Sequence, residues 1–254
     1  NNTAIGHDAL GSNITGGFNV AVGMNALTNS TVSGNTAVGY GALFNNTTGT
    51  GNTGMGTDAL DANTTGINNI GIGSSALGSN VTGGYNVGVG NGALENNTVS
   101  GNTGLGYHAL YANTTGTNNT ASGADALSSN TNGSNNTAYG NFSLTANSIG
   151  NSNAAFGESA LRNNTASNNT GFGFHALYAN TSGINNIAVG ADALDANTTG
   201  SENVAIGKDA MGGNTTGFNN IGVGSGSLQA NSTGNYNTGI GFNTLGANTT
   251  GSNN

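Results

Sequence analysis

The 254-residue chain has no cysteine, no proline and no tryptophan, and only 5% of its residues are charged. The absence of cysteine excludes disulfides and thiolate metal sites, and it leaves the redox compartment open. Lysine and arginine number 2 against 10 acidic residues, which gives a formal net charge of −8. Nucleic acids and anionic membrane surfaces attract basic proteins, so this charge balance argues against both as partners.

Long apolar runs are also missing. No segment is long enough to span a bilayer, and no basic and apolar signal sequence opens the chain. We therefore expect no membrane insertion by this segment. The chain begins and ends within its own repeat, at Asn1 and Asn254, which we interpret as a mature product or a segment of a longer fibre.

One short repeat accounts for the whole sequence. A leucine, replaced once by methionine, recurs at a short and nearly constant spacing. These residues are Leu10, Leu27, Leu43, Leu60, Leu77, Leu94, Leu110, Leu127, Leu144, Leu161, Leu177, Leu194, Met211, Leu228 and Leu245. A period this short predicts a solenoid, in which each repeat is one coil that leans on its neighbours. The abundance of Gly, Asn, Ser and Thr is typical of disordered linkers, but the strict spacing argues against disorder.

Each coil is numbered here from the asparagine before its apolar segment, so that residues 186–202 hold positions 1 to 17. Position 3 is Ala or Gly, and position 4 is apolar in nearly every coil, which predicts a short strand with positions 2 and 4 on one face. Glycine at position 5 ends this strand in a bend. We expect a second extended segment at positions 8 and 9, and a corner at positions 12 to 15 whose Asn and Gly adopt left-handed backbone.

The invariant positions form the predicted structural framework. Its first members are Asn2, Asn19, Asn35, Asn52 and Asn69 at position 1, Gly6, Gly23 and Gly39 at position 5, and Leu10, Leu27 and Leu43 at position 9. Stacked asparagines at positions 1 and 12 need amide-to-amide hydrogen bonds, because a buried unpaired amide is costly. We count the leucine and the apolar residue at position 4 as the core, and these are too few to offset the entropy of ordering a coil. This balance favours association of several chains.

A second rhythm groups the coils in fours. The leucine spacing shortens by one after Leu27, Leu94 and Leu161, and these three leucines are themselves evenly spaced. The next coil carries an aromatic pair in each case: Tyr40 and Phe44, Tyr107 and Tyr111, and Phe174 and Tyr178. Exposed rings at regular spacing stack on sugars or seat a partner chain, so these six residues are the candidate surface contacts. Packing over the shortened corner explains them about equally well.

The remaining polar residues do not predict catalysis or a cofactor. His7, His108 and His175 are interpreted as outward loop residues, since equivalents four coils apart are too distant to share a metal ion. The aspartates at position 7 are isolated between coils, and we attribute them to solubility rather than to Ca²⁺ binding. No Ser/His/Asp or Cys/His set clusters along the chain, so we expect no enzyme activity, no metal and no cofactor.

The strand segments resemble a known family. Asn-Thr-Ala-Ile-Gly-His-Asp-Ala at residues 2–9 and Asn-Val-Ala-Ile-Gly-Lys-Asp-Ala at residues 203–210 are similar to the head repeats of YadA-type trimeric autotransporter adhesins. Similar arrays occur in phage-tail-fibre-like shaft proteins. The resemblance implies a left-handed parallel β-roll and a homotrimer around a common axis. This chain departs from the family in its longer coils, its Asn-Thr-Thr-Gly corner and the leucine after the second alanine, and it lacks the neck and the stalk.

We therefore predict an all-β parallel β-solenoid or β-roll of about 15 coils, in one repeat-array domain over residues 1–254. The predicted role is structural, in an extracellular or cell-surface fibre that self-associates as a homotrimer or end to end. Many weak contacts along it, to a host or environmental glycan or surface, would give adhesion or scaffolding. The alternatives are an ice-binding solenoid that uses threonine rows such as Thr47 and Thr48, and a carbohydrate-binding module that uses the aromatic face.

Overall fold

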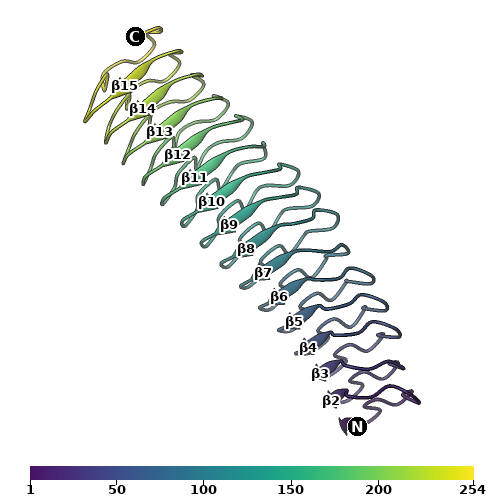
Figure 1. The fold of residues 1–254 in the computed structure, drawn as a ribbon. Helices are drawn as coiled ribbons and strands as arrows, with labels where there is room; N and C mark the ends of the chain where they lie inside the picture. The colour runs from purple at the N-terminus through teal and green to yellow at the C-terminus, as the bar shows by residue number, and fades with distance from the viewer. The chain divides into compact units, whose positions relative to one another are not determined.

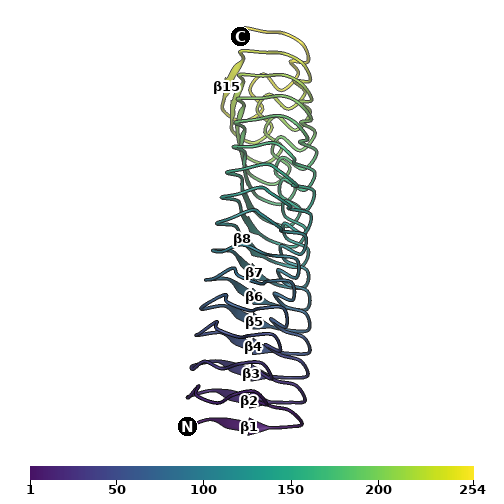
Figure 2. The ribbon, with the colours of Figure 1, turned by 90° about the vertical axis from the view of Figure 1, so that its right-hand side faces the viewer.

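The computed structural model describes residues 1–254, which form strands and turns but no helix. The chain divides into two compact units, Asn1–Asn132 and Gly133–Asn254. Within each unit, every coil contributes one three-residue strand, which lies beside the strand of the next coil (Figure 1; Figure 2). Each unit is thus a parallel β-solenoid, as the leucine spacing predicts. The single domain expected over residues 1–254 stays a prediction.

The two units contain fifteen strands, which mark about 14 turns of a 17-residue repeat. The first unit contains β1 (Thr3–Ile5), β2 (Val20–Val22), β3 (Thr36–Val38), β4 (Thr53–Met55), β5 (Ile70–Ile72), β6 (Val87–Val89), β7 (Thr103–Leu105) and β8 (Thr120–Ser122). The second contains β9 (Thr137–Tyr139), β10 (Ala154–Phe156), β11 (Thr170–Phe172), β12 (Ile187–Val189), β13 (Val204–Ile206), β14 (Ile221–Val223) and β15 (Thr238–Ile240). Neighbouring strands pair in register, so that Met55 lies opposite Ile72. Equivalent positions of successive coils therefore stack on one another.

The core of each unit is narrow and consists mainly of alanine and leucine. Alanines at positions 3 and 8 and the leucine at position 9 are fully buried, as in Ala21, Ala26 and Leu27. Where position 3 is glycine, the space is equally tight: a Cβ added at Gly54 would lie 3.2 Å from Cγ of Leu43. Small residues at positions 3 and 8 therefore let the strand approach the leucine segment closely.

Position 4 lies outside this core, and the prediction that counted it as core is wrong. Alternation along the strand buries position 3 and turns positions 2 and 4 to the surface. In β5, Ile70 and Ile72 are 38% and 37% exposed, while Gly71 between them is buried. Each unit therefore has an uncovered apolar face along its strands.

The predicted second strand at positions 8 and 9 is absent, because this segment is a turn. The residue at position 9 has a left-handed backbone in every coil, with φ between +51° at Leu27 and +56° at Leu77. This conformation costs a residue with a side chain about 1–2 kcal/mol. Burial of the leucine side chain and backbone hydrogen bonds to the next coil offset this cost. A small residue followed by leucine is common in strands too, so the pattern alone does not distinguish a strand from this turn.

The closing corner is also built differently from the prediction. In the 17-residue coils its left-handed residue is at position 17, for example Tyr85 with φ +60°, and not the asparagine at position 12 or the glycine at position 15. In the three shortened coils the left-handed residue is the last one, Gly34, Gly101 or Asn168. The asparagine is needed for its side chain: Nδ2 of Asn63 donates to Oδ1 of Asn46 at 2.9 Å and to the carbonyl of Gly66 at 3.1 Å. The glycine is needed for space, because a Cβ on Gly66 would collide with Oδ1 of Asn63.

Asparagines at positions 1 and 12 form the expected ladders of side-chain amides. At position 1, Nδ2 of Asn69 donates to Oδ1 of Asn52 at 3.2 Å, and the backbone N–H of Asn69 donates to the same oxygen at 2.9 Å. At position 12, the ladder is interrupted where a shortened coil begins. Oδ1 of Asn80 is buried without a partner, because Nδ2 of Asn97 donates to the carbonyl of Val99 in its own short corner.

The other framework residues lie where the repeat places them. Asn19, Asn35, Asn52, Asn69, Leu27 and Leu43 are buried, Leu10 is 9% exposed, Asn2 in the first coil is exposed, and Gly6, Gly23 and Gly39 have φ between +132° and +137°. At this glycine a Cβ has no room, since one built on Gly56 would lie 2.5 Å from the carbonyl oxygen of Gly73. Glycine at position 5 thus allows backbone of successive coils to stack at the bend.

Candidate functional site

The first candidate surface is the strand face, defined as the side chains at positions 2 and 4 of the strands in each unit. None of these residues is charged, and most are Val, Ile, Thr or aromatic. Its large exposed members include Val20, Met55, Ile70, Ile72, Leu105, Tyr139, Phe172, Ile187, Val189, Ile206 and Ile221. An exposed apolar face of this regularity is typical of an interaction surface.

Three aromatic residues stack on the strand face of the second unit. Ring centroids of Tyr139 and Phe156 are 5.3 Å apart, and those of Phe156 and Phe172 are 5.4 Å apart. The sequence analysis does not single out these residues. The feature of the sequence that identifies them is their shared position in the repeat, because all three hold position 4 in successive coils.

The second candidate surface is the charged face, defined as the side chains at positions 6, 7 and 10. It carries both cations, Arg162 and Lys208, and every acidic residue except Glu202. The acidic members are Asp8, Asp58, Asp61, Glu95, Asp125, Glu158, Asp192, Asp195 and Asp209. Charges that look scattered along the sequence are therefore aligned on one side of each unit. No group of three or more His, Cys, Asp or Glu side chains lies close enough to hold a metal ion.

The six candidate aromatic contacts lie on the charged face at positions 6 and 10. The first ring of each pair is exposed, at 48% for Tyr40, 51% for Tyr107 and 45% for Phe174. The second rings, Phe44, Tyr111 and Tyr178, are half-buried. Each pair therefore combines an exposed ring with a half-buried one.

His108 is a surface residue of a turn, as the sequence interpretation had it, and its ring lies between the two rings of its pair. Its ring stacks on Tyr107 with centroids 3.8 Å apart and an interplanar angle of 27°, and it lies 4.6 Å from the Tyr111 centroid. Nδ1 is 3.8 Å from Oδ1 of Asp125 in the next coil. The imidazole thus has an aromatic ring on each side and a carboxylate beside it.

The equivalent site in the second unit has the same arrangement. His175 stacks on Phe174 with centroids 3.7 Å apart, and its ring lies 4.7 Å from that of Tyr178. Its Nδ1 is 3.6 Å from Oδ1 of Asp192. His7 differs from both, because it is exposed and has only Asp8 as its ionic neighbour, at 3.0 Å.

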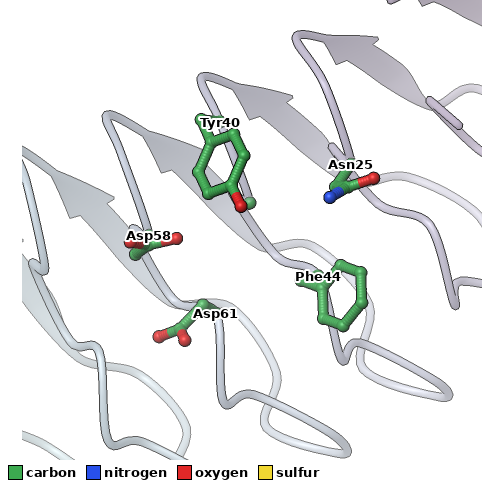
Figure 3. Close-up of a pocket in the computed structure, with 6 residues that line it drawn as sticks. Asn25, Tyr40, Phe44, Asp58 and Asp61 are labelled. Atoms are coloured by element: carbon green, nitrogen blue, oxygen red, sulfur yellow. The ribbon is translucent and has the colours of Figure 1, made fainter. Parts of the chain in front are cut away.

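Gly41 takes the place of histidine at the third site, and a cavity of about 130 Å³ lies there (Figure 3). Tyr40 and Phe44 line it from the coil of β3, and Asp58 and Asp61 line it from the coil of β4. Asn25 of the preceding coil completes the wall. A second, larger groove adjoins the cavity through the same two aspartates, with Ser75 and Glu95 among the other residues that line it.

The carboxylates at this site are not neutralised by the first unit itself. Burial raises the pKa of Asp61 above its usual 3.8, and the nearby charges of Asp58 and Glu95 raise it further. The equivalent Asp195 has a raised pKa for the same reasons, with burial first and Asp192 second. A cation placed beside either carboxylate would favour its ionised form.

The charged face also contains a cation over an aromatic ring. Cζ of Arg162 lies 4.8 Å from the centre of the Phe142 ring. Phe142 holds position 7 of its coil, and Arg162 holds position 10 of the next. Aromatic rings on this face therefore accept a planar nitrogen cation within the chain.

The threonine rows proposed for ice binding are partly used for the fold. Oγ1 of Thr47 donates to the carbonyl of Thr64 at 3.2 Å, and Oγ1 of Thr198 donates to that of Thr215 at 3.0 Å. The second threonine of the pair, such as Thr48, is exposed. Half of each proposed row therefore donates to the next coil instead of to water.

Comparisons with known proteins do not assign this chain to a family. No family model, no curated protein and no solved structure matches this chain. The resemblance to adhesin head repeats and tail-fibre shafts therefore stays a prediction. The structure has no helix of the length and hydrophobicity needed to cross a bilayer.

Proposed function

We propose that this chain is a structural component of an extracellular or cell-surface fibre, in which copies of the chain associate through the strand face. The observation that carries the proposal is the uncharged apolar row at positions 2 and 4, whose members such as Ile70 and Ile187 are 38% and 42% exposed. Burial of apolar surface stabilises by about 25 cal/mol per Å². Because every coil repeats the same small gain, association over many coils becomes strong.

The proposed assembly is a homotrimer around a common axis or an end-to-end filament. The core of one coil contains little beyond alanine and leucine, so covering the strand face supplies apolar burial that a single chain lacks. In-register pairing gives each coil the same side-chain spacing, which lets two copies meet over many coils. Closed symmetry is the usual outcome when identical surfaces associate.

The charged face and its aromatic rings would remain outside such an assembly. Weak contacts that recur along a fibre act together through a high effective concentration, so no single contact has to be strong. This supports an adhesive or scaffolding role toward a glycan or a surface. An ice-binding solenoid is the competing proposal, and a freezing-hysteresis assay on the purified chain separates it from a fibre.

The first experiment is the mass of the chain in solution by light scattering, with electron micrographs of the same fractions. We expect three times the mass of one chain, or filaments. The variant with Ile70→Lys and Ile187→Lys, one substitution on the strand face of each unit, should shift the protein to folded monomer. A discrete wild-type monomer at high concentration would exclude the proposed assembly.

A matched control comes from two isoleucines at position 16, which lie outside the strand face. Ile184 is 42% exposed, the same as Ile187, and Ile67 is partly exposed. The variant with Ile67→Lys and Ile184→Lys introduces the same two charges at the corners, and it should keep the wild-type mass. Equal loss of assembly in both variants would attribute the effect to charge and not to the strand face.

A further inference from the structure

The sites at Tyr40, Tyr107 and Phe174 are three copies of one arrangement, but only two are filled. His108 and His175 hold position 7 of their coils, each between two aromatic rings and beside an aspartate. Gly41 holds the same position in the coil of β3 that His108 holds in the coil of β7. We propose that the cavity at Gly41 binds a planar nitrogen cation, an imidazolium or guanidinium group, in the place that histidine fills in the other two copies.

The backbone at the three positions has the same left-handed conformation, so Gly41 is directly comparable with the two histidines. φ is +64° at Gly41, +51° at His108 and +55° at His175. The N–H of Gly41 donates to the carbonyl of Met24 at 3.1 Å, and that of His108 donates to the carbonyl of Asn91 at 3.0 Å. These bonds to the preceding coil fix position 7 whether or not a side chain is present.

The residues that line the cavity determine that its ligand carries a positive charge. Tyr40 and Phe44 line the cavity with two aromatic rings, and the faces of such rings attract cations. Asp58 and Asp61 offer carboxylates, and Glu95 lies in the adjoining groove. Both the lysine and the arginine of the chain belong to the second unit, so no Lys or Arg of the first unit neutralises these three groups.

The size of the cavity fits a small ring. The cavity volume of about 130 Å³ is well above the ~10–15 Å³ that a cavity needs to hold one water molecule. This is enough for a five-membered ring or a guanidinium group. The adjoining groove would accommodate whatever carries the group, such as a peptide.

The chain itself shows that both types of group suit this face. Imidazole rings of His108 and His175 lie between rings at two copies of the site, and the guanidinium of Arg162 lies over the ring of Phe142. At Gly41 one carboxylate oxygen of Asp58 lies against the place that a Cβ would take, so an entering cation would contact this oxygen. A neutral sugar would use the rings and would gain nothing from these charges.

The test is a titration of the full chain with 1,3-dimethylimidazolium, a planar ring with a permanent charge. We expect one molecule bound per chain, with shifts in the NMR signals of the Tyr40 ring and no shift at Tyr107. Neutral 1-methylpyrazole, which has a similar shape, should bind at least about tenfold more weakly. The double variant Asp58→Asn, Asp61→Asn should weaken binding of the cation by about tenfold and leave the pyrazole unaffected.

Two further variants change the number of binding sites, and we expect both to keep the fold. Gly41→His should abolish binding, because its φ matches that of His108 and the flexible Asp58 side chain can rotate away as Asp125 does. His175→Gly should create a second site, lined by Phe174, Tyr178, Asp192 and Asp195 by equivalence with the first. Binding that persists unchanged in Gly41→His, or equal binding of pyrazole, would overturn the proposal, as would an unshifted Tyr40 signal.

A second ligand distinguishes a cationic group carried by a peptide from a free organic cation. A tripeptide with a central histidine, tested at pH 5.5, would bind more tightly than free imidazolium if the group is carried by a peptide, because the groove then contributes. Tighter binding of the free ring would identify a small organic cation. None of these results depends on the strand face, so the test of the cation site is independent of the test of the proposed fibre.

Discussion

The backbone N–H of Leu43 donates to the carbonyl of Ala59, 3.0 Å away in the next coil, while Leu43 itself has a left-handed backbone with φ +53°. The same relationship joins Leu60 to Ala76 and Leu77 to Ala93. Each leucine therefore turns the chain, fills the core and links two coils. Replacing it should affect all three roles.

Leu60→Ala should lower the free energy of unfolding by about 2–5 kcal/mol, because it leaves a cavity in a core that has few other large side chains. Ile184→Ala is the control, since Ile184 holds position 16, outside the strand face, and is 42% exposed. This control should cost less than about 1.5 kcal/mol, because a side chain that is already partly exposed has less burial to lose. Urea denaturation at one fixed protein concentration measures both, and equal losses would contradict the assignment of position 9 as the core.

Gly56→Ala should destabilise by more than about 2 kcal/mol, because φ is +135° and the new Cβ would lie 2.5 Å from the carbonyl oxygen of Gly73. Gly17→Ala is its control. A Cβ on Gly17 meets no atom within 4 Å, and the residue has no positive φ. Thermal denaturation of the two variants should show a large fall in Tm for the first and almost none for the second.

The period of the sequence predicted the parallel solenoid because it reports which residues are equivalent. The leucine spacing alone implies that Met55 and Ile72 stack, and in the structure these two residues lie opposite each other in the pairing of β4 with β5. Period does not report which way a side chain points. Position 4 and position 9 are both apolar, yet the residue of the strand faces outward and Leu43 faces inward. Apolar residues on an interaction surface and in a core look alike in one sequence.

The candidate site was predicted in part, for a related reason. Tyr40 and Phe44 stand out because an aromatic pair occurs at the same positions in three coils that are four coils apart. The cavity beside them depends on Gly41, and its meaning comes from comparison with His108 and His175 in space. The carboxylates of Asp58 and Asp61 belong to the next coil, so only stacking of the coils brings them to the rings. In the sequence they read as isolated surface charges.

Asn63→Ala should lower the free energy of unfolding by about 1–3 kcal/mol for each buried polar group that it leaves without a partner. Nδ2 of Asn63 donates to Oδ1 of Asn46, and its Oδ1 accepts from Nδ2 of Asn80 at 3.0 Å. Asn91→Ala removes an exposed asparagine of the same unit and should be nearly neutral. Native-state hydrogen exchange should show the loss in the coils next to residue 63, and an unchanged exchange rate there would contradict the role of the ladder.

Asp61→Asn should raise the free energy of unfolding at pH 7. Burial and the charges of Asp58 and Glu95 raise the pKa of Asp61 above its usual 3.8. The folded state therefore holds this proton more tightly than the unfolded state, so stability falls as the pH rises from 3.8 through the raised pKa, and the full cost is present above it. Below pH 3.8 the aspartate is neutral in both states, and the advantage of asparagine should disappear.

Denaturation curves of wild type and variant at pH 3 and pH 7 measure this difference. Asp195→Asn should behave in the same way in the second unit, since burial and Asp192 raise the pKa of Asp195. An equal gain at both pH values would mean that the amide packs better, and that ionisation is not the cause. If the gain is confined to neutral pH, Asp61 is a charge that the folded unit keeps at a cost, which is what a residue retained for cation binding should show.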